Sequence, residues 1–214
     1  DIARIEAGKL GMEIVPVALR ETVAEAVGLS LPAAESHRIE IRHDVAPITP
    51  VAADRRRLLQ VLLNLLSNAI KYNRPGGEVA IGAQVAGGRV RVEVVDTGIG
   101  IDPAQAGDLF QPFTRLAAGA ARTEGTGLGL SLSRALIEAM GGVIGYAPRA
   151  DGRDGACFWF ELPVAAPARV PELLPARPPL PSHKADRPLT APCRRPPPRF
   201  PARSGAARPD DAEH

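Results

Sequence analysis

The most constraining stretch of the chain runs from Asp54 to Tyr72 and reads D-R-R-R-L-L-Q-V-L-L-N-L-L-S-N-A-I-K-Y. Its apolar residues recur at intervals of three and four, the spacing that places them on one face of an α-helix. Asp54 stands where an N-cap residue accepts hydrogen bonds from the first free backbone amides. The stretch therefore predicts a mostly buried amphipathic helix. Its apolar positions are Leu58, Leu59, Val61, Leu62, Leu65, Leu66, Ala69 and Ile70.

The same helix carries an unusual polar stripe. Asn64, Asn68, Lys71 and Tyr72 fall at positions i, i+4, i+7 and i+8 and so lie along one face. An unpaired asparagine in so apolar a helix costs about 1–3 kcal/mol, so these two amides need partners. Those partners are either a neighbouring loop or helix end, or a metal ion with its polyphosphate. The helix alone does not choose between the two.

Composition excludes several functional classes. The chain has 214 residues, enough for one domain with a real core, and a net charge of +2 gives no nucleic-acid signal. No apolar run approaches the ~18 residues of a membrane-spanning helix, so we expect a cytoplasmic chain without membrane contact. Cys157 and Cys193 give neither a disulfide framework nor metal-ligand spacing.

Periodicity and turn residues predict the remaining elements. The first is a helix over Leu19–Ala34 that Pro32 kinks or ends, in which the residues available to face a core are Val23, Ala26, Val27, Leu29 and Leu31. A half-exposed strand then opens at His37, a short strand follows at Val51, and Glu78–Val85 and Arg89–Val95 form a hairpin around Gly87-Gly88. The last elements are a short helix from Pro103 to Phe110 capped by Asp102, a helix ending near Met140, and two strands, Val143–Ala147 and Cys157–Leu162. Trp159 in the last strand is expected to be a core residue.

Two glycine-containing motifs suggest chemistry. In Asp96-Thr97-Gly98-Ile99-Gly100, a carboxylate at a strand end can accept from the exocyclic amine of adenine, while the glycines leave room for the base. Taken alone, the motif is equally compatible with a simple turn. The second motif is Gly125-Thr126-Gly127-Leu128-Gly129, where a following helix can present backbone amides to phosphates.

The second motif is weak evidence by itself. It follows an irregular segment of lid type, Phe113 to Glu124, rather than a strand, so a Rossmann site is not predicted. No G-x-x-x-x-G-K-[ST] phosphate loop is present either.

The ordered combination is far more specific. An Asn-x-x-x-Asn helix, then D-x-G-x-G, then F-x-x-F at Phe110 and Phe113, then G-x-G-x-G before a helix resembles the catalytic ATP-binding domain of sensor histidine kinases, in the GHKL superfamily. The resemblance implies an α/β two-layer sandwich, with a mixed, mostly antiparallel sheet covered by helices on one face. It covers residues 15–163. Residues 1–14 resemble the end of a dimerisation helix, and residues 164–214 are a Pro/Arg/Ala-rich tail expected to be disordered.

The resemblance also implies ATP and Mg²⁺ as cofactors and assigns roles. Asn68 would ligate Mg²⁺ with Asn64 beside it, Lys71 would contact phosphate, and Tyr72 would lie near the nucleotide. Asp96 would bind the adenine amine in a pocket shaped by two glycines. The residues implied for that pocket and for the lid's end against the phosphates are Gly98, Gly100, Gly125, Thr126, Gly127, Leu128 and Gly129.

Phe110 and Phe113 are implied to anchor the start of the lid. Arg115 and Arg122 lie within it, and either can be the residue that reaches the γ-phosphate; a solvated role is open for both.

The implied reaction is transfer of the γ-phosphoryl group to a histidine of a dimerisation domain. Related ATPases that hydrolyse ATP have a glutamate where this chain has Asn64, and an amide cannot act as a general base. A nucleotide-binding regulatory module and a GHKL-type ATPase remain the alternatives. The partners implied are the kinase's own phosphoacceptor domain and a response regulator. His43-Asp44-Val45-Ala46-Pro47 resembles an acceptor motif only superficially, so we expect the chain to bind ATP without autophosphorylation. Because most of the implied dimerisation module is not in this sequence, we expect a monomer.

Overall fold

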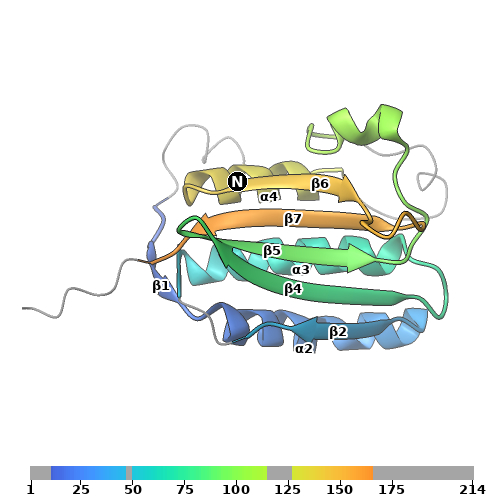
Figure 1. Cartoon of the computed structure of the whole chain (residues 1–214), viewed down its shortest axis with the longest axis horizontal. Helices are drawn as coiled ribbons and strands as arrows, with labels where there is room; N and C mark the ends of the chain where they lie inside the picture. The colour runs from blue at the N-terminus through green and yellow to red at the C-terminus, as the bar shows by residue number, and fades with distance from the viewer. Residues whose placement is uncertain (1–10, 47–49, 115–126, 166–214) are drawn as a thin grey trace, which may run out of the picture. The chain divides into compact units, whose positions relative to one another are not determined.

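The computed structural model describes residues 11–46, 50–114 and 127–165 (Figure 1). A five-stranded sheet in the order β2-β4-β5-β7-β6 forms one layer. Strand β2 is parallel to β4, and the other neighbouring pairs are antiparallel. The strands are β2 (Glu40–Asp44), β4 (Glu78–Ala86), β5 (Arg89–Asp96), β6 (Val143–Pro148) and β7 (Ala156–Pro163).

Three helices form the second layer, on one face of the sheet (Figure 1). They are α2 (Leu19–His37), α3 (Arg55–Lys71) and α4 (Gly129–Ala139). This arrangement confirms the predicted two-layer sandwich with a mixed, mostly antiparallel sheet. Among the described residues, no helix combines the length and the apolar character that crossing a membrane requires.

Helix α3 lies between α2 and α4 and holds the helical layer to the sheet. Its N-terminus is capped as predicted, because Oδ1 of Asp54 accepts a hydrogen bond from the backbone N–H of Arg57 at 3.1 Å. Leu58, Leu62 and Leu65 are completely buried. Burying one such side chain contributes about 1.5–3 kcal/mol, so this apolar face accounts for much of the cohesion between the layers.

Helix α2 continues past Pro32 to His37, so the prediction that the helix could end at Pro32 was wrong, while the predicted kink stays a prediction. Proline removes one backbone donor and crowds the carbonyl four residues earlier, here that of Gly28. Gly28 and Pro32 are both exposed, so water can satisfy the freed carbonyl, while Ser30 and Ala34 stay buried on the opposite side. Burial of that side outweighs the local disruption.

Two other predictions for this region need correction. Leu29 and Leu31 are 59% and 44% exposed and do not face the core, whereas Val23, Ala26 and Val27 do. His37 is the last residue of α2 rather than the first of a strand. The helix ends there because Arg38 takes a left-handed conformation with φ 57° and its N–H donates to the carbonyls of Ala34 and Glu35.

The predicted hairpin is confirmed as β4 and β5, which pair antiparallel across Gly87 and Gly88. Both glycines have positive φ, 56° and 75°, which the tight turn requires. Along β5, Val90, Val92 and Val94 are buried beneath the helices.

The opposite face of the sheet carries Trp159, which is half-buried rather than a core residue as predicted. The guanidinium carbon of Arg91 lies 4.0 Å from the centroid of its ring, and the ring also covers Gly145. Strict alternation in β7 explains the placement, because Phe158 and Phe160 on either side of Trp159 take the core positions.

Smaller elements complete the described fold. Strands β1 (Val15–Val17) and β3 (Val51–Ala53) pair antiparallel as a separate two-stranded sheet. The short helix after β5 is a 3-10 helix, η1 (Pro103–Asp108), and Oδ1 of Asp102 accepts from the backbone N–H of Ala104 at 2.9 Å, as an N-cap residue does.

We expect Leu62→Ala to lower the free energy of unfolding by about 2–5 kcal/mol, because it removes a fully buried side chain and leaves a cavity. Leu29→Ala is the matched control on a neighbouring helix and should change it by no more than ~0.5 kcal/mol, since Leu29 is mostly exposed. Urea unfolding followed by circular dichroism measures both. Equal losses in the two variants would contradict the burial described.

Candidate nucleotide-binding site

Three segments far apart in the sequence meet at one end of the sheet. Helix α3 and strand β5 both end there, and the loop between β6 and β7 lies at the same end (Figure 1). Backbone contacts join the first two, because the N–H of Ile99 donates to the carbonyl of Tyr72 at 3.2 Å. The asparagine helix and the Asp96 motif therefore form one site.

The carboxyl group of Asp96 is the best-defined feature of this site. Asp96 ends β5 and is only 4% exposed. Its Oδ1 accepts two backbone hydrogen bonds, from the N–H of Gly98 at 2.8 Å and from that of Ala156 at 3.2 Å. Within the described part of the chain, Oδ2 accepts none. One oxygen thus fixes the carboxylate, and the other is left to a ligand donor.

Burial raises the pKa of the Asp96 carboxyl above its ordinary value. The backbone hydrogen bonds from Gly98 and Ala156 and the nearby Arg149 guanidinium oppose this rise without cancelling it. Burial favours the neutral form of the carboxyl group, so any hydrogen-bond donor that reaches the carboxylate stabilises its ionised form. Asp96 therefore has the electrostatic character of a recognition group.

The glycines of the Asp96 motif allow a close approach between segments. A Cβ on Gly98 would lie 2.3 Å from the carbonyl oxygen of Tyr72, far inside contact distance. Gly100 has φ +70° and lies against the backbone of Gly155. Both glycines therefore serve close packing between segments, and their role in shaping a pocket for a base stays a prediction.

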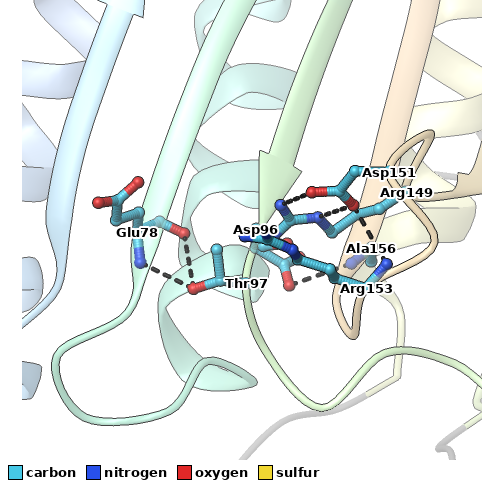
Figure 2. Close-up of polar contacts among 7 residues, drawn as sticks. All are labelled: Glu78, Asp96, Thr97, Arg149, Asp151, Arg153 and Ala156. Carbon is cyan, nitrogen blue, oxygen red and sulfur yellow. Dashed lines mark hydrogen bonds and ion pairs between the residues drawn. The ribbon is translucent and has the colours of Figure 1, made fainter.

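A polar network next to this motif was not predicted from the sequence. The Thr97 hydroxyl contacts Oδ1 of Asn73 at 3.2 Å and accepts from the N–H of Glu78 at 2.9 Å, while Nδ2 of Asn73 donates to the Glu78 carbonyl at 3.0 Å. Figure 2 shows Thr97 and Glu78 on one side of Asp96 and the β6–β7 loop on the other. The sequence of this segment, Asn73-Arg74-Pro75-Gly76-Gly77, is typical of an ordinary turn and does not reveal the network.

The two asparagines of α3 have different environments. Nδ2 of Asn64 donates to the hydroxyl of Ser133 on α4 at 2.9 Å, and a Cβ on Gly129 would meet Oδ1 of Asn64 at 2.2 Å. Asn68 is half-buried, and its side-chain amide forms no hydrogen bond to any described residue. Asn64 therefore joins two helices, whereas the amide of Asn68 is available for a ligand.

The other predicted residues of the stripe lie at the rim. Lys71 is the last residue of α3 and is exposed, and Tyr72, its C-cap, is 37% exposed. Both stand at the end of the helix that carries Asn68. Their contact with phosphate or nucleotide stays a prediction.

The structure describes only the two ends of the predicted lid. Phe110 packs edge-on against Phe158, with ring centroids 6.5 Å apart. The ring of Phe113 is 75% exposed, and this residue is held by its backbone, whose N–H donates to the carbonyl of Gly127 at 3.1 Å. Leu128 and Gly129 then begin α4. Arg115, Arg122, Gly125 and Thr126 lie outside the described residues.

Groups of three or more His, Cys, Asp or Glu that could enclose a metal ion are absent from the described residues. A magnesium ion bound with a nucleotide does not need one, since Mg²⁺ takes most of its ligands from phosphates and water. A single unpaired amide oxygen such as that of Asn68 suits this mode of binding.

Comparison with known proteins first defines the class. The family described as "Histidine kinase-, DNA gyrase B-, and HSP90-like ATPase" matches residues 53–166, more than half of the chain. The chain belongs to this family of ATPases. Its relatives narrow the class further, to the ATP-binding catalytic domain of a sensor histidine kinase.

Two curated relatives support this narrower class of protein. The sensory/regulatory protein RpfC of Xanthomonas campestris pv. campestris is 38% identical over 173 residues, which cover 77% of this chain and 24% of RpfC. The cell-division control histidine kinase PdhS of Brucella anthropi is 39% identical over 150 residues, covering 65% of this chain and 14% of PdhS. The chain thus spans a quarter or less of the length of these relatives.

Solved structures similar to this chain support the same class of protein. Full-length ShkA in complex with AMPPNP has a TM-score of 0.67 and 35% identity, over 78% of this chain and 35% of the ShkA chain. The catalytic domain of the histidine kinase ThkA has a TM-score of 0.63 and 32% identity, over 72% of this chain and 97% of the ThkA domain. An almost complete isolated catalytic domain is therefore matched, which confirms the predicted fold family.

The raised pKa of Asp96 predicts a pH-dependent difference between the wild type and Asp96→Asn. The amide oxygen of Asn can keep both backbone hydrogen bonds without the buried charge. Because the folded-state pKa lies above the unfolded one, the wild type loses stability as pH rises through the folded value. The stability of Asp96→Asn relative to wild type should increase from about pH 4 upward and then level off.

Urea unfolding of the two proteins at a series of pH values measures this difference. A difference that stays constant, or that shrinks as pH rises, would contradict the environment described for Asp96.

Proposed function

We propose that this chain binds Mg-ATP between α3, the Asp96 motif and the start of α4, and positions the γ-phosphate for transfer to a histidine side chain. In this proposal residues 15–163 are the catalytic domain, residues 1–14 end a dimerisation helix, and residues 164–214 are a tail. The domain works in the cytoplasm.

The single observation that carries the proposal is that only one oxygen of the Asp96 carboxylate accepts hydrogen bonds from the described residues. Two backbone amides occupy Oδ1 and none of the described residues donates to Oδ2, so the free oxygen can accept from a planar ligand's amino group. Gly98 and Gly100 leave no side chains beside it. The exocyclic amine of adenine is such a donor, and ATP is accordingly the nucleotide proposed.

The phosphate end of the proposed site follows from α3 and α4. Asn68 is the proposed ligand of Mg²⁺, and Lys71 the proposed partner of a phosphate. The backbone amides at Gly127, Leu128 and Gly129 come at the N-terminal end of α4, where the helix dipole favours anions. Gly125, Thr126 and the lid arginines extend this part of the proposal to residues outside the described ones.

Transfer is favoured over hydrolysis because of Asn64. Its amide donates to Ser133 and abuts Gly129, and an amide has no basic atom to activate water. We therefore place Asn64 as a structural member of the site that holds α4 against α3. Phosphoryl transfer then needs mainly orientation and charge neutralisation, which the remaining residues supply.

The proposed phosphate acceptor is a histidine on a dimerisation domain, with a response regulator as the next partner. His37 ends α2 and His43 lies on the edge strand β2, so both belong to the catalytic domain of this proposal and not to its dimerisation helix. ThkA, a relative of known structure, has been solved in complex with the response regulator protein TrrA.

Calorimetric titration with a non-hydrolysable ATP analogue, with and without Mg²⁺, tests the proposal. Asp96→Asn should weaken binding by roughly 10-fold or more, because the Asn amide can present a donor to the adenine amine in place of a charged acceptor. Asn68→Ala should abolish the gain in affinity that Mg²⁺ provides. Leu29→Ala, an exposed change away from the site, is the control and should bind normally.

Binding that is absent in a folded wild type would refute the proposal. Mg²⁺-independent binding equal in wild type and Asn68→Ala would remove Asn68 as the metal ligand. Steady-state hydrolysis that Asn68→Ala abolishes would instead favour the ATPase alternative over transfer.

A further inference from the structure

The loop between β6 and β7, residues 149–155, lies directly against the backbone of Asp96. Nη1 of Arg149 is 3.5 Å from the carbonyl oxygen of Asp96. A Cβ on Gly155 would lie 2.1 Å from that same oxygen and 2.7 Å from Cδ of Arg149. Only a glycine, here with φ +131°, lets the loop come this close.

Arg149 is itself fixed by an ion pair within the loop. Its Nε and Nη2 donate to the two carboxylate oxygens of Asp151, at 3.0 Å and 2.5 Å, in a bidentate arrangement. The side chain of Arg149 is only 14% exposed, whereas that of Asp151 is 43% exposed. Oδ1 of Asp151 also accepts from the N–H of Arg153 at 3.2 Å, and the N–H of Gly152 donates to the Arg149 carbonyl at 3.1 Å. Figure 2 shows the contacts of Asp151 with Arg149 and Arg153 beside Asp96.

The loop leads directly into the second donor on which Asp96 depends. Ala156, whose N–H binds Oδ1 of Asp96, comes immediately after Gly155. The position of the loop therefore sets the position of that N–H. Loosening the loop would free Oδ1 from one of its two donors and let the carboxylate rotate.

We propose that Arg149, held in place by Asp151, is a positioning residue for adenine recognition: it locks the β6–β7 loop against Asp96 so that Oδ1 stays saturated and Oδ2 faces the ligand. This inference rests on the proposed role of Asp96 in binding the adenine amine. It adds a specificity element more than fifty residues away in the sequence, in a loop whose polar composition suggests a solvated turn.

The positive charge of Arg149 supports the function proposed for Asp96, as its contacts with the loop do. Other titratable groups that interact with Asp96 are Tyr146 on β6 and Cys157 on β7; burial, reinforced by Asp96 itself, raises the pKa of each above its ordinary value, so both are neutral at pH 7. Asp151 raises the pKa of the Arg149 guanidinium most strongly, and the charge of Glu78 adds a smaller rise. Among the described residues, Arg149 is thus the cation that favours the ionised form of Asp96.

Arg149→Met, which keeps the aliphatic stem without the charge, is the main test. Affinity for the ATP analogue should fall by roughly 10-fold at neutral pH, and the acid pH at which binding is half lost should move upward. Asp151→Asn, which weakens the ion pair, should change the affinity and the pH of half-binding in the same directions but by smaller amounts. Arg134→Met removes an exposed ion pair with Glu138 on α4 and serves as the control, with no change expected.

Arg149→Lys separates charge from geometry. It should keep the pH midpoint of the wild type, while hydrogen exchange at the amides of Gly98 and Ala156 in the nucleotide-free protein becomes faster, as in Arg149→Met. A folded Arg149→Met with an unchanged pH midpoint and unchanged exchange at both amides would overturn the inference.

The amide exchange and an NMR titration of the Asp96 carboxyl distinguish this failure from that of the proposed function, because neither needs nucleotide. Suppose that the wild type binds no nucleotide but that Arg149→Met changes both the amide exchange and the titration of Asp96. That result would support the positioning of Asp96 by Arg149 and refute the role of Asp96 in binding adenine. If Arg149→Met does not fold, the same readouts in Asp151→Asn and Arg149→Lys decide, and wild-type values in both would overturn the inference.

Discussion

The carboxylate of Asp96 lies in a place where water barely reaches it, and much of the site is arranged around that buried group. Two backbone amides converge on one of its oxygens, one from the loop after β5 and one from the start of β7. Because those amides come from segments about sixty residues apart, the carboxylate is oriented only when the sheet is fully assembled. The proposed recognition of a ligand at Oδ2 would therefore depend on the whole fold.

Helix α3 connects this recognition group to the rest of the site. Its apolar face is buried against the sheet, its end contacts the Asp96 loop through the carbonyl of Tyr72, and its Asn64 holds the start of α4. Glycines occur at the contact points, since side chains at Gly98 and Gly129 would overlap Tyr72 and Asn64. The glycines of both motifs thus serve close packing between segments, as well as leaving space for a ligand.

Periodicity predicted α3 and the β4–β5 hairpin well because burial dominates both elements. The two-layer class followed from the family resemblance that the ordered motifs carry. Reading the sequence locally failed in two places. Burial of Ala34 keeps α2 helical beyond Pro32, and the alternation of β7 puts Trp159 on the outer face of the sheet. Motif order predicted Asp96 and Asn68 as site residues. It could not reveal Ser133, Arg149 or Gly155, because their importance lies in contacts that only the folded sheet creates.

Competition between ADP and inosine diphosphate tests the central claim most directly, because the two differ at the adenine amine, which a carbonyl replaces in inosine. The account predicts that the wild type prefers ADP by roughly 10-fold or more, since the carbonyl oxygen would face the Asp96 carboxylate. In Asp96→Asn the preference should vanish or reverse, because the amide can donate to that oxygen. Equal affinity of the wild type for both nucleotides would contradict adenine recognition by Asp96.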